Sequence, residues 1–258
     1  MRGFLALHGS WIICVLVISL SAQVMAADGP VAAAVERGDA FDDQLKTREA
    51  LAAYLEAEKL GGKDAELLRK IAREYAESMG DVSSLEERRS LGEKAVPYAQ
   101  RAVAADPANA MAHLALAICY GRLAPLMDSK TKIAYSKMVK DQVDQSIKLD
   151  PTIDYSYHVL GAWNYELAGL NPVLRLLAKL IYGDVPSASY EEAVRNFKKA
   201  IELAPHRVAH HVELGRTYAA MGQTALAREE LNKGLALPSR EKDDPQTKER
   251  GRAALKNL

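Results

Sequence analysis

The sequence has little cysteine, proline and glycine, and no excess of charge of either sign. Its two cysteines are Cys14, inside an apolar N-terminal stretch, and Cys119. The one thiol outside that stretch can form neither an internal disulfide nor a multi-cysteine metal site. Proline and glycine, at 10 and 16 residues of 258, are too few for a collagen-like or mainly disordered chain. With 34 basic and 34 acidic side chains there is no cationic excess, so we expect no nucleic-acid partner.

Sequence signatures of enzymes are absent as well. There is no glycine-rich phosphate loop, no pair of metal-binding histidines flanking a glutamate, and no Gly-x-Ser-x-Gly nucleophile turn. His210 and His211 are adjacent, so on a helix they point about 100° apart and cannot face one metal ion together. We therefore predict a non-enzymatic protein without catalytic residues, cofactors or metal ligands.

Residues 1–26 resemble an export signal. Arg2 supplies a positive start, an apolar core runs from Trp11 to Leu20, and Val24 and Ala26 suit cleavage after Ala26. The alternative is an uncleaved anchor, but a membrane span needs about 20 continuous apolar residues and this core has half that length. We expect a periplasmic or secreted bacterial protein. If the leader is retained, it is the chain's only membrane contact and holds the repeat domain on an organelle membrane, facing the cytosol.

The chain also contains a repeated helical hairpin. From Val208 to Gly222 apolar residues recur at helical spacing, and a second amphipathic stretch runs from Ala225 to Pro238. Gly222 can adopt the left-handed conformation that ends a helix, so two helices of opposite direction are predicted. This unit resembles the tetratricopeptide repeat, which has small residues where paired helices touch and large residues between neighbouring pairs.

The same frame extends backwards over most of the chain. We predict five units in the domain that spans residues 27–241, and they cover 31–64, 65–109, 110–153, 154–207 and 208–241. Pro107, Pro151 and Pro205 fall where the second helix of a unit must end. Five stacked pairs bury a core that one pair cannot, so the predicted fold is an all-α, tetratricopeptide-like superhelix. Residues 242–258 are predicted to form a linker and a helix that caps the last repeat.

Three of the predicted units contain insertions. The extra residues form a polar stretch from Gly80 to Ser90, place Asp128 or Ser129 as the cap of a long helix, and predict an additional helix after Asn171. That additional helix has a broad apolar face. We predict that it packs on neighbouring repeats; the alternative is a hydrophobic patch for a membrane or a partner helix.

The inserted segments also narrow the family. They include Lys130-Thr-Lys-Ile-Ala-Tyr-Ser-Lys137, Ser146-Ile-Lys-Leu-Asp-Pro151, His158-Val-Leu-Gly-Ala-Trp163 and residues 178–193. These segments resemble the regulator of microtubule dynamics family over residues 65–258. The resemblance implies a tetratricopeptide-like helical domain, association with microtubules in eukaryotic members, and no catalytic residues. A protein exported from a bacterial cell does not meet cytosolic tubulin, so in that case the family describes ancestry and shape rather than activity.

Fixed positions on each first helix line the concave face of such a superhelix. In this chain they hold acidic residues in the first unit, then arginines, then tyrosines. The predicted partner-binding residues are Arg69, Arg73, Arg122, Tyr155, Tyr165 and Arg216. Guanidinium groups suit carboxylates and tyrosines offer rigid apolar area, so we predict a groove for a peptide or protein segment with an acidic group. The alternative is a solvated face whose arginines pair with neighbouring glutamates, at about 0.2 to 0.5 kcal/mol per pair.

Overall fold

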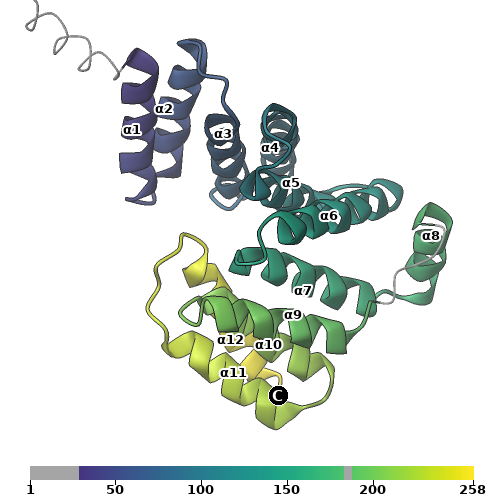
Figure 1. Cartoon of the computed structure of the whole chain (residues 1–258). Coiled ribbons are helices and arrows are strands. Elements are labelled where there is room, and N and C mark those ends of the chain that lie inside the picture. Colours follow the sequence, from purple (N-terminus) through teal and green to yellow (C-terminus); the bar gives the residue numbers. More distant parts are fainter. Residues whose placement is uncertain (1–28, 183–187) are drawn as a thin grey trace, which may run out of the picture.

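The computed structural model describes residues 29–182 and 188–258 (Figure 1). Within these two ranges the chain consists of helices joined by loops and contains no strand, which confirms the predicted all-α fold. The predicted export signal, residues 1–26, lies outside the described residues. None of the described helices combines the length and the apolar character that a membrane crossing requires.

The helices form five hairpins stacked in chain order. They are α1 (Pro30–Asp42) with α2 (Thr47–Lys59), α3 (Ala65–Ser78) with α4 (Leu85–Ala105), α5 (Ala110–Leu123) with α6 (Ser129–Leu149), α7 (Asp154–Ala168) with α9 (Tyr190–Leu203), and α10 (Val208–Ala220) with α11 (Thr224–Ala236). A short 3-10 turn, η1 (Ala124–Leu126), precedes α6, and α8 (Pro172–Tyr182) lies between α7 and α9 in the sequence. The last helix is α12 (Asp244–Lys256).

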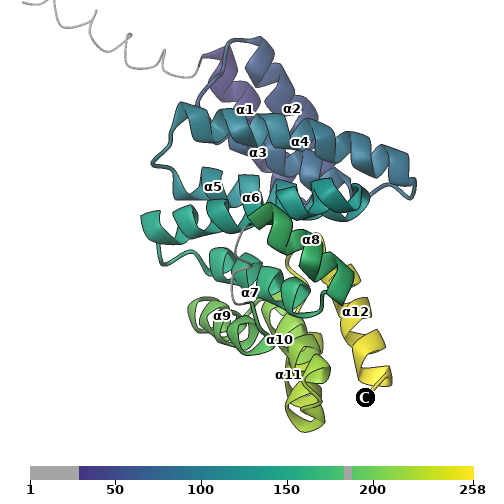
Figure 2. The same ribbon diagram turned by 90° about the vertical axis from the view of Figure 1, so that its right-hand side faces the viewer.

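The first helices of the second to fifth hairpins form one continuous layer. Helix α3 contacts α5, α5 contacts α7, and α7 contacts α10, while each second helix contacts its own partner and the first helix of the next hairpin. The stack curves into a crescent in Figure 1, and Figure 2 shows the same stack from its outer side. This arrangement confirms the predicted superhelix of paired helices.

Local sequence signals set several helix ends. Five side chains accept a hydrogen bond from a backbone N–H in the first turn of α3, α4, α5, α6 and α9, and they are Asp64, Ser84, Asn109, Asp128 and Ser189. Gly222 has φ 72° between α10 and α11, the left-handed conformation expected of it. The second helices α4, α6 and α9 each end two residues before a proline.

Glycine marks the closest approach of the two helices in three hairpins. In each case a large side chain of the second helix lies against the glycine of the first, and a Cβ atom there would be nearer than van der Waals contact. The pairs are Gly38 with Tyr54, Gly161 with Phe197, and Gly215 with Leu231. These hairpins therefore pack closely enough to exclude even a methyl group from the contact.

Gly215→Ala is expected to lower the free energy of unfolding by about 1 to 3 kcal/mol, because overpacking forces neighbouring atoms to shift. The new Cβ would lie 2.7 Å from Cγ of Leu231 and 2.9 Å from its backbone nitrogen. Backbone cannot move away cheaply, so this cost exceeds the helix propensity of about 1 kcal/mol that alanine gains over glycine. Urea denaturation followed by circular dichroism measures the change.

Gly121→Ala is the matched control, since Gly121 also lies in a first helix, α5. Its nearest neighbour to an added Cβ would be Cγ2 of Val139 at 3.8 Å, an ordinary contact. We expect this substitution to raise stability by about 0.5 to 1 kcal/mol. Equal effects of the two substitutions would contradict the close contact at Gly215.

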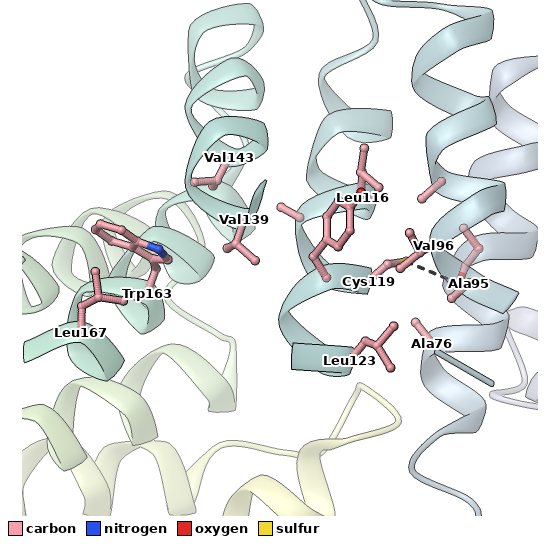
Figure 3. Packing of buried hydrophobic residues seen from close by; sticks show 14 residues of the cluster. Ala76, Ala95, Val96, Leu116, Cys119, Leu123, Val139, Val143, Trp163 and Leu167 are labelled. Carbon is pink, nitrogen blue, oxygen red and sulfur yellow. Dashed lines mark hydrogen bonds between the residues drawn. The ribbon is translucent and has the colours of Figure 1, made fainter. Parts of the chain in front are cut away.

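The largest buried cluster joins the second, third and fourth hairpins (Figure 3). Cys119 of α5 lies against α3, with its Sγ 3.9 Å from the carbonyl oxygen of Ala72, while Val143 of α6 packs toward Trp163 of α7. The indole N–H of Trp163 donates to the carbonyl oxygen of Ser136 at 2.9 Å. Burial raises the pKa of the Cys119 thiol to about 12, so this cysteine is a small apolar side chain of the core.

Helix α8 contacts α6 and lies on the outer side of the stack (Figure 2). Ala178 is buried, and Asn171 caps the helix by accepting from the backbone N–H of Leu174 at 2.9 Å. Three large apolar side chains on the opposite side are 76%, 63% and 75% exposed, and they are Val173, Leu176 and Leu180. The predicted packing on a repeat is present, but it covers only part of the broad apolar face.

Helix α12 packs against α10 and α11 and covers the end of the stack. Ala254 and Leu255 contact the buried cluster formed by Val208, Val212 and Leu231. The predicted capping helix is therefore confirmed. The linker of residues 237–243, yellow in Figure 1, passes along the open, inner side of the crescent before α12 begins.

Candidate partner-binding groove

All six residues predicted for the groove lie on helices of the inner layer. Arg69 and Arg73 belong to α3, Arg122 to the end of α5, Tyr155 and Tyr165 to α7, and Arg216 to α10. The structure brings Tyr165 and Arg216 into contact and places Arg122 beside the linker. It does not bring Arg69 and Arg73 to those residues, because both pair with acidic side chains nearby.

The two arginines of α3 face carboxylates of this chain. Nε of Arg69 donates to Glu66 at 2.8 Å. Arg73 pairs with Asp42 of the first hairpin and donates to Glu74 at 2.9 Å. Burial acts to lower the pKa of Arg73, but its hydrogen bond to Asp42 and the charge of Glu74 raise it. An acidic partner group that reached these arginines would have to displace carboxylates already bound to them.

Glu74 is a buried carboxylate that the sequence analysis missed. Its side chain is covered completely, one oxygen accepts from Arg73, and Oε2 has no hydrogen-bond partner among the described residues. Burial raises its pKa to about 7, and the positive charge of Arg73 opposes that rise. Its position three residues after Ile71, on the apolar side of α3, is the sequence signal that could have identified it.

Arg122 connects the inner layer to the linker. Its Nη1 donates to the carbonyl oxygen of Ala76 at 3.2 Å, and its Nη2 lies 3.5 Å from Oδ2 of Asp243. The second contact joins residues 121 positions apart in the sequence. A guanidinium group of the groove therefore faces a carboxylate in the turn before α12, and this contact is made within the chain itself.

Tyr155 lies beside a buried chain of polar groups that runs between α7 and α10. Oδ2 of Asp154 forms an ion pair with Nε of Arg207 at 2.7 Å and accepts from Nε2 of His210 at 2.9 Å. Nδ1 of His210 lies 3.0 Å from Nδ1 of His158. The ring of Tyr155 is 4.9 Å from the His158 ring, centre to centre, and the Arg207 guanidinium carbon is 5.1 Å from the tyrosine ring centre.

The geometry fixes the direction of the hydrogen bonds among Asp154, His210 and His158. Burial lowers the pKa of His158 and of His210, so both rings are neutral near pH 7. A neutral His210 that donates through Nε2 to Asp154 offers Nδ1 as an acceptor, and Nδ1–H of His158 donates to it. The position of His210 beside His211 in the sequence does not reveal its contact with a histidine 52 positions away.

Tyr165 and Arg216 line an open cavity of 430 Å³ formed by α7, α10 and α12. The Arg216 guanidinium carbon lies 5.4 Å from the centre of the Tyr165 ring, and Nη1 donates to Glu213 at 2.5 Å. Arg250 of α12 also lines the cavity, and alanines of α10 and α12 form its apolar part. Arg216 and Arg250 both pair with Glu213, so two positive charges face one carboxylate. The remaining positive charge, a tyrosine and small apolar side chains suit a ligand that combines a carboxylate with apolar groups.

Three carboxylates near the start of α12 come within 4.8 Å of one another. Glu241 pairs with Arg207, Asp243 contacts Arg122, and Asp244 accepts two backbone N–H groups. Because all three already have partners within the chain, we assign no metal ion to them.

A known protein family matches most of the chain. The family described as "Regulator of microtubule dynamics protein 1-3" matches residues 34–258. The chain belongs to this family. Regulator of microtubule dynamics protein 1 of Mus musculus is 32% identical over 203 residues, which are 78% of this chain and 65% of that protein. The Pongo abelii protein of the same name is 30% identical over 234 residues, 87% of this chain and 72% of that one.

The chain matches part of each curated relative and the whole fold of a solved solenoid. The chain spans 65% of the length of the mouse relative and 62% of the Bos taurus relative. Among solved structures, a thermophilic TPR protein of Thermus thermophilus superposes with a TM-score of 0.63 at 17% identity, over 87% of this chain and 98% of that one. At such low identity this likeness shows the fold alone, which is the tetratricopeptide-like solenoid expected from the sequence.

Proposed function

We propose that this family member is a non-enzymatic scaffold that binds a segment of a partner protein on the inner face of its solenoid. The observation that carries the proposal is the open cavity of Tyr165, Arg216 and Arg250. Tyrosine and arginine are among the side chains that supply most binding energy in protein interfaces. Family membership and the solenoid fold support a role in protein interaction.

The predicted groove residues contribute unequally to this proposal. Tyr165 and Arg216 line the cavity, while Arg122 and Tyr155 lie at the middle of the inner layer near the linker. Arg69 and Arg73 already pair with carboxylates of the first two hairpins, so we assign them a supporting role in setting the shape of the acidic end.

Replacing both Arg216 and Arg250 with alanine is expected to reduce retention of the partner at least about tenfold, since truncated hot-spot arginines typically cost more than about 1 kcal/mol each. Affinity capture with quantitative mass spectrometry measures the change. The control variant is Arg195→Ala with Lys199→Ala, which removes two exposed cations of α9. Equal retention by the wild type and both variants, with unchanged circular dichroism, would reject the cavity as the binding site.

A second candidate function is that of a membrane-anchored regulator of microtubules that faces the cytosol. The family match favours it, since the relatives carry regulation of microtubule dynamics in their names. Co-sedimentation of the chain with polymerised tubulin tests it. Pelleting that depends on tubulin concentration supports this candidate, and a chain that stays in the supernatant at every tubulin concentration rejects it.

We further propose that the chain is exported to the periplasm or the medium of a bacterial cell, with cleavage after Ala26. The proposal rests on the short apolar core and small side chains of residues 1–26. N-terminal sequencing of the mature protein distinguishes the two locations. A first residue of Ala27 supports export, and an intact N-terminus in the membrane fraction supports the anchor.

A further inference from the structure

The linker between α11 and α12, residues 237–243, contacts the opposite end of the solenoid across the inner face (Figure 1). Nζ of Lys242 donates to Oδ2 of Asp81 at 2.7 Å, and it also donates to the hydroxyl of Thr47. Thr47 begins α2 in the first hairpin, and Asp81 follows α3 in the second. One lysine therefore connects the C-terminal linker to the first two hairpins.

The residues on both sides of Lys242 are acidic, and both contact arginines. Asp243 lies 3.5 Å from Arg122, at the end of α5, and Glu241 pairs with Arg207, just before α10. The linker thus presents an acidic, a basic and an acidic side chain in sequence, and each pairs with a residue of opposite charge on the inner face. Complementary charges in a fixed order select a partner segment and its register.

The backbone of the linker is held in a defined turn. Asp244 is buried, and its Oδ2 accepts from the backbone N–H groups of Arg240 at 2.7 Å and Glu241 at 2.9 Å. This turn orders the segment before its side chains bind, which reduces the entropy lost on binding. The linker therefore resembles a bound peptide rather than a flexible linker.

A competing protein segment can replace the ion pairs that the linker makes with the inner face. The side chains in the pairs Lys242 with Asp81 and Asp243 with Arg122 are between 21% and 35% exposed. Water reaches such pairs, so each holds the linker only weakly. A segment that makes the same three contacts and adds others in the cavity beside Tyr165 can replace the linker.

We propose that the linker is an intramolecular ligand of the inner face, and that the partner is a protein segment that adopts the same turn with the same charge order, acidic, basic, acidic. This inference rests on the proposed function, because it names the class of segment bound there. The partner segment displaces residues 241–243 and pairs with Arg207, Asp81 and Arg122. A tethered linker has an effective concentration of about millimolar, so it suppresses binding of a free segment to the wild type.

A synthetic peptide of residues 237–245 carrying a fluorophore tests the proposal on the full chain. In the triple variant Glu241→Ala, Lys242→Ala, Asp243→Ala, the retained Asp244 keeps the start of α12. We expect fluorescence anisotropy to show at least about tenfold tighter binding to this variant than to the wild type. Adding Arg122→Ala to the triple variant should weaken binding of the peptide by up to about fivefold.

The control variant Glu249→Ala with Arg252→Ala removes an exposed charge pair of α12 that does not contact the inner face. It should bind the peptide as weakly as the wild type does. A peptide with the three charges reversed should bind none of the variants. Equal binding of the native peptide to the wild type and the triple variant, or no binding to a triple variant with unchanged circular dichroism, would overturn the inference.

A second measurement applies if the triple variant fails to fold. Asp81→Asn leaves the linker sequence intact and removes the carboxylate that holds Lys242. Tryptic cleavage after Lys242, followed by mass spectrometry, should then be at least about tenfold faster than in the wild type, since a released segment is cleaved more readily. An unchanged cleavage rate would overturn the inference. Partner retention that depends on Arg216 and Arg250 but not on the linker would keep the proposed function and reject only this inference.

Discussion

Phe197→Ala is expected to lower the free energy of unfolding by about 3 to 5 kcal/mol, the typical cost of removing a buried aromatic ring from a core. Phe197 is 1% exposed and fills the contact between α9 and α7. Its ring lies over Gly161 and, at 5.4 Å between ring centres, beside His158. We expect a cavity to remain, because the surroundings of a removed core side chain relax only in part. Urea denaturation gives the loss directly.

A double-mutant cycle tests the contact between Phe197 and Gly161 directly. Gly161→Ala alone should destabilise the protein, because an added Cβ would lie 2.9 Å from the Phe197 ring. In the Phe197→Ala background the same methyl group enters the cavity, so the second substitution should cost less or stabilise. Leu226→Ala, at an exposed position of α11, is the control and should change stability by less than about 0.5 kcal/mol. Additive effects of the two core substitutions would contradict the contact.

Glu74→Gln is expected to stabilise the protein at pH 8 by about 2 to 3 kcal/mol, because each unit of pKa shift corresponds to about 1.36 kcal/mol. The pKa of Glu74 rises from its ordinary value of 4.5 to about 7 on folding. A raised pKa contributes stability that is complete below pH 4.5 and is lost as the pH rises through 7. Glutamine keeps the shape of the side chain without a charge, so the variant should lose this pH dependence.

The difference between the two stability curves isolates Glu74 from other buried groups. His158 and His210 have lowered pKa values, so their contribution has the opposite sign: it is present above pH 6.5 and is lost as the pH falls. These histidines are the same in wild type and variant, so their contribution cancels. Glu36→Gln on the exposed side of α1 controls for the change in net charge. A difference between wild type and Glu74→Gln that is the same at pH 5 and pH 8 would contradict the buried ionisation.

The helical hairpins could be predicted because their signals are local. Gly161 and Gly215 mark close helix contacts, Asp128 caps α6, and the prolines at 107, 151 and 205 follow the second helices. Each of these residues acts on atoms within its own hairpin. Their repetition along the chain then determines how the hairpins stack.

The groove was less predictable because its contacts join residues far apart in the sequence. Position on a first helix identified Tyr165 and Arg216, and the structure brings these two together. Position on a first helix did not indicate that Arg73 would pair with Asp42, a residue of another hairpin. The acidic end of the groove is consequently closer to neutral than the sequence pattern indicated.

The path of the linker could not be predicted from its composition. Lys242 and Asp243 lie in a polar stretch of the kind that normally connects helices in solvent. Their partners, Asp81 and Arg122, are 161 and 121 positions away. Only the curvature of the whole stack brings these positions together, and curvature is the sum of small rotations between hairpins.

Photo-crosslinking tests most directly whether the inner face is the binding surface. Benzoylphenylalanine is introduced at Tyr165, which lines the cavity, and separately at Met138, which is 39% exposed on α6. We predict that irradiation in the presence of the partner gives an adduct from position 165 and none from position 138. Adducts from position 138 alone, or equal adducts from both positions, would contradict a groove on the inner face of the solenoid.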